Sequence, residues 1–316
     1  MQEAAGLRTP FRRLPPIRVV VPELSRSEAP LGYLLNVPAL LAVFIVIGYP
    51  IADTFWISLN RYRLAPPTFS FVGFQNYVAA VNDPALLGAL GFSVLFSVLC
   101  VPIILVLGLA AALVLNEPFR GRGFVRMLVV VPWAVPSVVN GQLWQMIFNG
   151  KYGALDGLLY SLGLIHDYRS WLSDPAQAIP ALVVANVWNS VPVAIIVFLA
   201  ALQAIPSELY EAARVDRANA VQRFQHVVLP WLQQAILIVL VLQTIIAMRT
   251  YDIIYVLTGG GPGTSTTTIS WLAATTSFRF LDFGLGSTYS IIIALVTLAL
   301  AFVYFKVLYA RGDFRL

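Results

Sequence analysis

The sequence predicts an all-α, polytopic membrane protein with six transmembrane helices. Of its 316 residues, 59% are hydrophobic and only 11% are charged, whereas soluble domains carry roughly 25% charged residues. Six strongly apolar windows contain no Asp, Glu, Lys or Arg, and each reaches the roughly 20 residues that a helix needs to cross a bilayer. Lipid is therefore the expected solvent for most of the exterior.

Six spans in one membrane domain, residues 29–310, follow from these windows when they are extended to the expected helix ends. Prolines within several of the windows predict kinked or broken helices, which membranes tolerate where neighbouring helices or a cavity satisfy the backbone. The predicted spans are residues 31–58, 85–115, 124–148, 179–204, 231–256 and 284–309.

Two further windows without charge, 64–82 and 253–278, are predicted not to span. The first contains Pro66-Pro67 and polar residues, and the second contains "TGGGPGTSTTT", Thr258 to Thr268. The backbone polar groups of such a segment would be unsatisfied in lipid. The glycines at 259–261 predict a turn at the exit of a helix, because glycine adopts turn conformations without steric cost.

The distribution of basic residues predicts the orientation. Fourteen of the 20 Lys and Arg residues fall on one side of the predicted membrane, which the positive-inside rule assigns to the cytoplasm. That side holds a basic arm (1–28), a charged loop (207–230) and a short tail (311–316), so both termini are expected to be cytoplasmic. This topology also explains the net charge of +5 without nucleic acid as a partner.

The sequence lacks the residues that several kinds of binding and catalysis require. The sequence contains no GxxxxGK[ST] phosphate loop and no GxSxG nucleophile motif. Two histidines and one cysteine, Cys100, give no familiar metal cluster, so we expect this chain to bind no cofactor itself. The six apolar windows lack the charged side chain with which ion-coupled carriers usually bind their ion.

The charged loop "SELYEAARVDRANAVQRFQHVVLP", Ser207 to Pro230, stands out between two apolar runs. Ser207 is expected to cap a helix, and Asn219 with Gln222 forms a second capping signal. We therefore predict two short helices with a bend near residues 217–219. The residues alone leave two roles open, an amphipathic linker at the membrane interface and a docking site for a cytoplasmic protein.

Part of this loop, "EAARVDRANAVQRFQHVVLP", resembles the EAA loop of ATP-binding-cassette (ABC) importer membrane subunits. Arg217 stands where that family usually has glycine, which leaves open whether Arg217 or Asn219 takes a positive φ at the bend. Two other stretches, "WNSVPVAIIVFLAALQAIPSELYEAA" and "TYDIIYVLTGGGPGTSTTT", resemble permeases of the maltose, glycerol-phosphate and trehalose group, and "FVGFQNYVAAVND" resembles their outer loop.

The resemblance implies a type I ABC importer permease fold in a bacterial plasma membrane. It implies as partners a second permease subunit, two ATP-binding subunits that use ATP and Mg²⁺, and an extracytoplasmic solute-binding protein. The implied substrate is a sugar, with a disaccharide such as trehalose as the leading candidate. The residues implied to couple the loop to the ATPase are Glu211, Ala212, Ala213, Asp216 and Arg217.

Candidate sugar-binding residues come from the same resemblance and from polar residues in the predicted spans. Sugars are bound through hydrogen bonds together with aromatic faces. The resemblance implies Asn186, Trp188, Ser190, Gln243, Ile246, Ala247 and Thr250, and the physical reading adds Asn189, Asn140 and Gln145. We expect Arg249, Tyr251 and Asp252 near the outer mouth, where they mark an interface.

Two other classes of protein stay open at this point. One is an ion-coupled sugar carrier or channel that acts without an ATPase, which would transport sugar as a purified single chain. The other is a membrane enzyme, although no catalytic constellation is present in the sequence.

Overall fold

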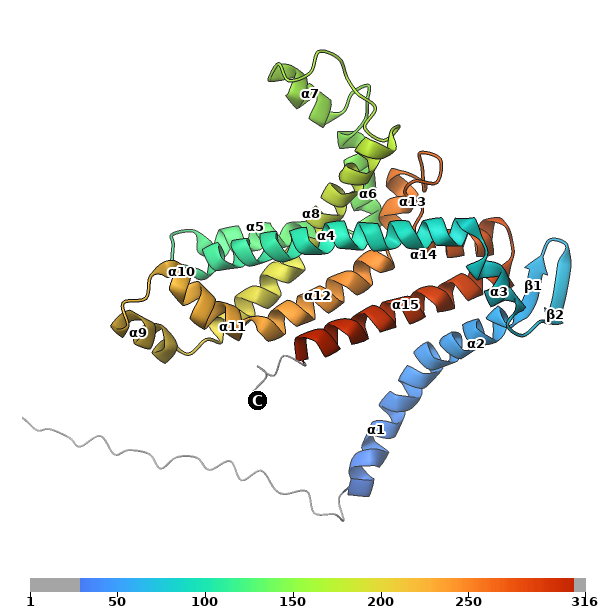
Figure 1. Ribbon diagram of the computed structural model, residues 1–316, viewed down its shortest axis with the longest axis horizontal. Helices are drawn as coiled ribbons and strands as arrows, with labels where there is room; N and C mark the ends of the chain where they lie inside the picture. Colours follow the sequence, from blue (N-terminus) through green and yellow to red (C-terminus); the bar gives the residue numbers. More distant parts are fainter. Residues whose placement is uncertain (1–28, 310–316) are drawn as a thin grey trace, which may run out of the picture. The chain divides into compact units, whose positions relative to one another are not determined.

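The computed structural model describes residues 29–309, which form two compact units that divide at Ala52 and Asp53 (Figure 1). The predicted arm, 1–28, and tail, 311–316, lie outside the described residues. The first unit contains α1 (Ala29–Val43), the π-helical turn η1 (Phe44–Gly48) and the start of α2 (Tyr49–Ser58). Together these elements include one candidate span, Tyr33–Ser58, in agreement with the predicted first span.

Three long helices dominate the second unit, namely α4 (Pro84–Asn116), α8 (Pro175–Gln203) and α15 (Phe283–Tyr309). The first two begin in the same way, because an aspartate caps the helix and a proline occupies its first turn. Asp83 accepts from the Ala85 N–H, and Asp174 accepts from the Ala176 N–H. The three helices match the predicted spans 85–115, 179–204 and 284–309.

The predicted third span, 124–148, is broken into α5 (Arg122–Ala134) and α6 (Ser137–Ile147), which are bent by 96°. Val135 takes an extended conformation before Pro136, as the steric demand of a following proline requires. Pro136 also lacks the N–H that would continue the helix. The break thus falls at one of the prolines that predicted a kinked or broken helix.

The predicted fifth span, 231–256, is also discontinuous. The π-helical turn η2 (Phe224–Val228) and α11 (Leu229–Trp231) precede α12 (Gln233–Met248), and the chain then turns at residues 249–251 before α13 (Asp252–Leu257). The segments Ala220–Trp231 and Gln233–Met248 are bent by 64°. If each bent pair counts as one span, the described residues contain six candidate spans, and four if they do not.

Helices α4, α8 and α12 enclose the main core of the second unit. Phe96 and Ile104 of α4, Phe198 of α8 and Val239 of α12 are almost fully buried there. Gly108 allows α4 and α8 to approach closely, because a Cβ atom at this position would lie 2.7 Å from the Cβ of Ala194. This packing fixes the helices that carry the polar side chains described below.

Short elements occupy the two ends of the second unit (Figure 1). One end holds α9 (Ser207–Val215) and α10 (Ala220–Arg223), and the other holds α3 (Gln75–Val81), α14 (Ile269–Ala274) and η3 (Thr275–Arg279). A further short helix, α7 (Ala154–Ser161), lies in the connection between α6 and α8. The separation of α9 and α10 from α14 agrees with the predicted placement of these loops on opposite sides of the membrane.

The all-α prediction did not include a small antiparallel hairpin, which is formed by β1 (Asn60–Leu64) and β2 (Pro67–Phe71). It pairs Asn60 with Phe71. Arg63 Nε donates to Asp282 Oδ2 at 2.6 Å, which ties the hairpin to the start of α15. The window 64–82 thus forms a small folded cap at this end rather than a span, as the sequence predicted.

Candidate functional site

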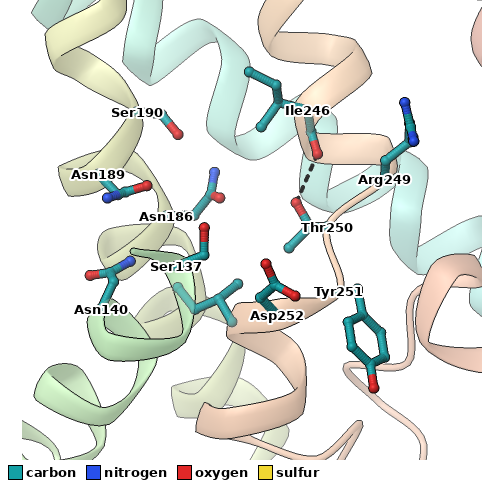
Figure 2. A pocket seen from close by; sticks show the side chains of 11 residues that line it. Ser137, Asn140, Asn186, Asn189, Ser190, Ile246, Arg249, Thr250, Tyr251 and Asp252 are labelled. Atoms are coloured by element: carbon teal, nitrogen blue, oxygen red, sulfur yellow. Dashed lines mark hydrogen bonds between the residues drawn. The ribbon is translucent and has the colours of Figure 1, made fainter. Parts of the chain in front are cut away.

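A polar cavity of about 220 Å³ lies where the two broken spans meet α8 (Figure 2). Its walls come from the start of α6, from one face of α8, and from the turn that joins α12 to α13. The residues that line it are Ser137, Asn140, Asn186, Asn189, Ser190, Ile246, Arg249, Thr250, Tyr251, Asp252 and Ile253.

The break before α6 places Ser137 and Asn140 in this cavity. Asn140 is 1% exposed, and its Nδ2 donates to the carbonyl oxygen of Ala185 in α8 at 3.2 Å. Its Oδ1 is buried and has no hydrogen-bond partner among the described residues. A buried carboxamide oxygen of this kind is expected to find a donor, and a ligand hydroxyl in the cavity is suited to that role.

Helix α8 contributes Asn186, Asn189 and Ser190, which share one face because residues three and four apart lie together on a helix. The Nδ2 of Asn189 donates to the carbonyl oxygens of Pro132, at 2.6 Å, and Val135, at 3.2 Å. Figure 2 shows its oxygen on the side that faces the cavity. Asn189 therefore holds the broken span in place and keeps an acceptor for a ligand.

The turn after α12 adds the charged groups. Helix α12 ends at Met248, and the Oγ1 of Thr250 donates back to the carbonyl oxygen of Ile246 at 2.9 Å. The Thr268 hydroxyl donates to the carbonyl oxygen of Thr250 at 2.8 Å and so anchors this turn to the next loop. Asp252 then begins α13, with its carboxylate directed into the cavity (Figure 2).

The arrangement of these side chains suits a polyhydroxyl ligand. Figure 2 shows the Asp252 carboxylate, the Ser137 hydroxyl and the Asn186 carboxamide directed into the same space, whereas Arg249 extends away from them. Among the described residues, neither Arg249 nor Asp252 belongs to an ion pair. A carboxylate accepts hydrogen bonds from hydroxyl groups, and a carboxamide both accepts from them and donates to them.

Six of the predicted sugar-binding residues thus come together in one cavity, and four do not. Gln145 lies apart and donates to the carbonyl oxygen of Val256 at 3.2 Å, while Gln243 and Ala247 are each 1% exposed and packed within the bundle. Trp188 lines an apolar groove and meets Trp144 edge-on, with 6.0 Å between the ring centroids. The six are Asn140, Asn186, Asn189, Ser190, Ile246 and Thr250.

The structure also adds residues that the sequence did not place here. Arg249, Tyr251 and Asp252 were expected to mark an interface at the outer mouth, but they line the cavity. The fifth span was read as continuous to residue 256, so the turn that brings these residues inward was missed. Ser137 was missed as well, although Pro136 before it is a recognisable helix-breaking signal.

A second candidate site is the charged loop formed by α9 and α10. Glu211, Ala212, Asp216 and Arg217 are exposed, whereas Ala213 is buried. Tyr210 packs against the main core, and its burial, with the nearby Glu117 carboxylate, raises the pKa of its phenol above the usual value. Tyr210 thus anchors α9 to the core, while four of the five residues that the sequence predicted to couple the loop to an ATPase face outward.

The bend between α9 and α10 settles the question raised by Arg217. Arg217 has a φ of 53°, and Asn219 has a φ of −72°, so it is Arg217 that takes the left-handed conformation. The Ala218 N–H donates to the carbonyl oxygen of Ala213, which closes the end of α9. Asn219 and Gln222 form the predicted capping box, but Ser207 is the first residue of α9 and makes no capping bond.

A bundle of long apolar helices, with broken spans around a polar cavity, defines a membrane transport protein, because discontinuous helices form the substrate sites of many transporters. Residues 104–312 match the family described as "Binding-protein-dependent transport system inner membrane component". The chain belongs to this family.

Relatives and a solved structure agree with this membership. The chain is 41% identical over 291 residues to the trehalose/maltose transport system permease protein MalF of Thermococcus litoralis, covering 92% of this chain and 98% of that protein. It is 35% identical over 284 residues to the trehalose transport system permease protein SugA of Mycobacterium tuberculosis, covering 89% of each.

The fold matches a chain of the bacterial alginate ABC transporter, solved in complex with an alginate pentasaccharide-bound periplasmic protein. The TM-score is 0.76 at 21% sequence identity, and the match covers 89% of this chain and 95% of that one. The second unit and its broken spans thus have the fold of a type I ABC importer permease, as the sequence predicted.

Proposed function

We propose that this chain is the membrane-spanning subunit of an ATP-driven importer for a neutral sugar. The observation that carries this proposal is the cavity at the broken spans, where a carboxylate and three carboxamides meet. Such groups form hydrogen bonds with hydroxyls, and they lie among charge-free apolar helices where a soluble solute otherwise has no favourable contacts.

We further propose that the sugar is a disaccharide such as trehalose. Two relatives have trehalose in their names, and in each case the match covers most of the relative's length. The Asp252 carboxylate favours a neutral ligand, since an acidic sugar placed against it would meet a like charge.

The importer would require partners, and the size of the cavity and the sequence of the chain are consistent with two kinds of them. The cavity of about 220 Å³ is smaller than the roughly 300–1,000 Å³ of typical ligand sites, as expected if a second permease subunit supplies the remaining wall. The chain lacks a phosphate loop, so ATP and Mg²⁺ would be used by two ATP-binding subunits that dock on the exposed loop at 207–230. An extracytoplasmic binding protein would deliver the sugar.

The positive-inside rule orients this assembly. With 14 of 20 basic residues on one side, both termini and the 207–230 loop would lie in the cytoplasm. In this orientation the loop would be on the side of the membrane where ATP is available. The same orientation leaves the opposite end of the bundle, with α14 and the hairpin, toward the binding protein on the outside of a bacterial inner membrane.

Reconstitution of the complete complex in liposomes tests the proposal. Binding protein loaded with trehalose or maltose should stimulate ATP hydrolysis and drive uptake of that sugar, whereas unloaded binding protein should stimulate less. Sugar uptake by the purified chain without an ATPase would contradict the proposal and favour a carrier. An absence of uptake for every sugar tested with the complete complex would contradict the assignment of sugar as the substrate class.

A further inference from the structure

A second cavity, of about 440 Å³, lies between the start of α4, the loop at 258–268 and α14. Two of its lining residues are aromatic, Phe92 and Trp271, and four carry hydroxyls, namely Thr264, Ser265, Thr267 and Thr275. Small residues of α4, including Gly88, form another part of the wall. The cavity is set apart from the central one, with which it shares none of its lining residues.

The lining of this outer cavity fits an uncharged, hydroxylated ligand. None of the described residues that line it is charged. The Oγ of Ser265 is buried and has no hydrogen-bond partner among the described residues. Because buried hydroxyls are nearly always bonded, an unpartnered one in the wall of a cavity indicates a ligand or a solvent group that completes it.

A stacked pair of aromatic rings connects the outer cavity to the central one. Tyr251 lines the central cavity and Trp271 lines the outer cavity. Their ring centroids are 5.6 Å apart with an interplanar angle of 28°, and Tyr255 packs against both rings. A sugar that leaves the outer cavity would therefore meet an aromatic surface that leads to the central site.

The loop that forms the outer cavity is held in place by its own hydroxyls. The Thr266 hydroxyl donates to the Gly261 carbonyl at 2.6 Å, and the Thr258 hydroxyl lies within hydrogen-bond distance of the same Thr266 oxygen, at 2.8 Å. Gly260 has a φ of 87°, and a Cβ atom at this position would collide with the Trp271 ring. The cavity is thus preformed, which lowers the entropic cost of binding a ligand.

We propose that the outer cavity is a second binding site for the transported sugar, which the sugar occupies before it enters the central cavity. The inference rests on the proposed function, because it takes its ligand to be the same neutral sugar. The proposal adds a second, extracytoplasmic site at the 258–268 loop, separate from the central cavity.

Filling the cavity tests the proposal with a matched control. A Cβ atom at Gly88 or at Gly91 meets no atom within 4 Å, so larger residues fit at both positions of α4, but only Gly88 lines the outer cavity. Equilibrium binding of radiolabelled trehalose and maltose is measured on the assembled complex without its binding protein. We expect Gly88→Leu to lose one of two equivalents of bound sugar and Gly91→Leu to keep both. Equal binding by both variants and by wild type would overturn the proposal.

Ser265→Ala provides a second measurement that does not depend on a bulky side chain. If Ser265 bonds the sugar, the half-saturating sugar concentration of the outer site should rise about threefold to tenfold, as expected for one lost hydrogen bond. If its hydroxyl is merely buried, its removal should leave binding unchanged and raise the thermal unfolding midpoint, because an unsatisfied polar group is gone. The second result would count against an outer site.

The same assays separate this proposal from the proposed function. Uptake of either sugar by the wild-type complex, with unaltered binding in Gly88→Leu and Ser265→Ala, would reject the outer site and leave the importer intact. An absence of uptake and of bound sugar in the wild type would reject the importer, and the outer site with it.

Discussion

The Nδ2 atom of Asn189 donates to the carbonyl oxygen of Pro132 at 2.6 Å, across the break between α5 and α6. In a continuous helix that carbonyl would accept from the N–H of residue 136, but Pro136 has none. The same nitrogen donates to the Val135 carbonyl at 3.2 Å. One carboxamide of α8 thus compensates for the bonds lost at the break, and the break in turn places Ser137 and Asn140 in the central cavity.

Asn189→Leu should therefore destabilise the bundle as well as weaken transport. The substitution leaves the Val135 carbonyl without its donor and the Pro132 carbonyl with only the 3.3 Å bond from the Val135 N–H, at a cost of about 1–3 kcal/mol. Ser190→Ala is the control, because it removes a polar group from the next position along α8. Among the described residues, the Ser190 side chain makes no hydrogen bond to the broken span. The thermal unfolding midpoint of the purified complex should fall in the first variant and not in the second. Equal midpoints would show that the break does not depend on Asn189.

Asp252→Asn should weaken sugar binding with little effect on stability. Hydrogen bonds to a charged acceptor contribute about 1 kcal/mol more than those to a neutral one, so the half-saturating sugar concentration for uptake should rise about fivefold to tenfold. Asp167→Asn removes the same charge from an exposed position outside the cavity and should leave uptake unchanged. If both variants take up sugar as the wild type does, Asp252 does not contact the substrate.

Local sequence signals predicted the parts of the structure that depend on neighbouring residues. The Asn219–Gln222 capping box is set by spacing along a helix. The contact between Tyr251 and Trp271 cannot be predicted from such spacing, because it requires the chain to turn at residues 249–251 and to return after the glycine loop. The same turn placed Asp252 in the cavity, where the sequence alone did not locate it.

The position of Trp188 shows a second limit of this kind. Its aromatic ring suggested a sugar contact, but it lies two residues from both Asn186 and Ser190, and residues at this spacing do not face each other on a helix. In the structure its ring borders an apolar groove with Val187 and Pro192. The aromatic side chain of Trp188 suggested a sugar contact, but its position on the helix directs it away from the cavity.

Arg217→Gly should stabilise the bend between α9 and α10. A non-glycine residue at a φ of 53° is strained by about 1 kcal/mol, which glycine relieves. Arg217→Ala removes the same charge but keeps the Cβ atom, so it should give no relief. Hydrogen exchange at the Ala218 amide, which bonds to the Ala213 carbonyl, should slow about fivefold in the glycine variant only. Equal exchange in both variants would show that the bend is not strained by the side chain.

Glu211→Ala should uncouple ATP hydrolysis from the sugar-loaded binding protein and leave the folded bundle intact. Glu211 is exposed on α9 beside the bend, and truncation of one partner in a docked charge pair costs about 2–5 kcal/mol of interface stability. Glu208→Ala is the matched control, because it removes the same charge one turn earlier and loses only a favourable interaction with the helix N-terminus, about 0.3–1 kcal/mol. Stimulated ATPase activity of the reconstituted complex should fall more than tenfold in the first variant and by less than half in the second. If Glu211→Ala retains full stimulation, the ATP-binding subunits do not rely on this carboxylate, and the coupling contact must lie elsewhere on the 207–230 loop.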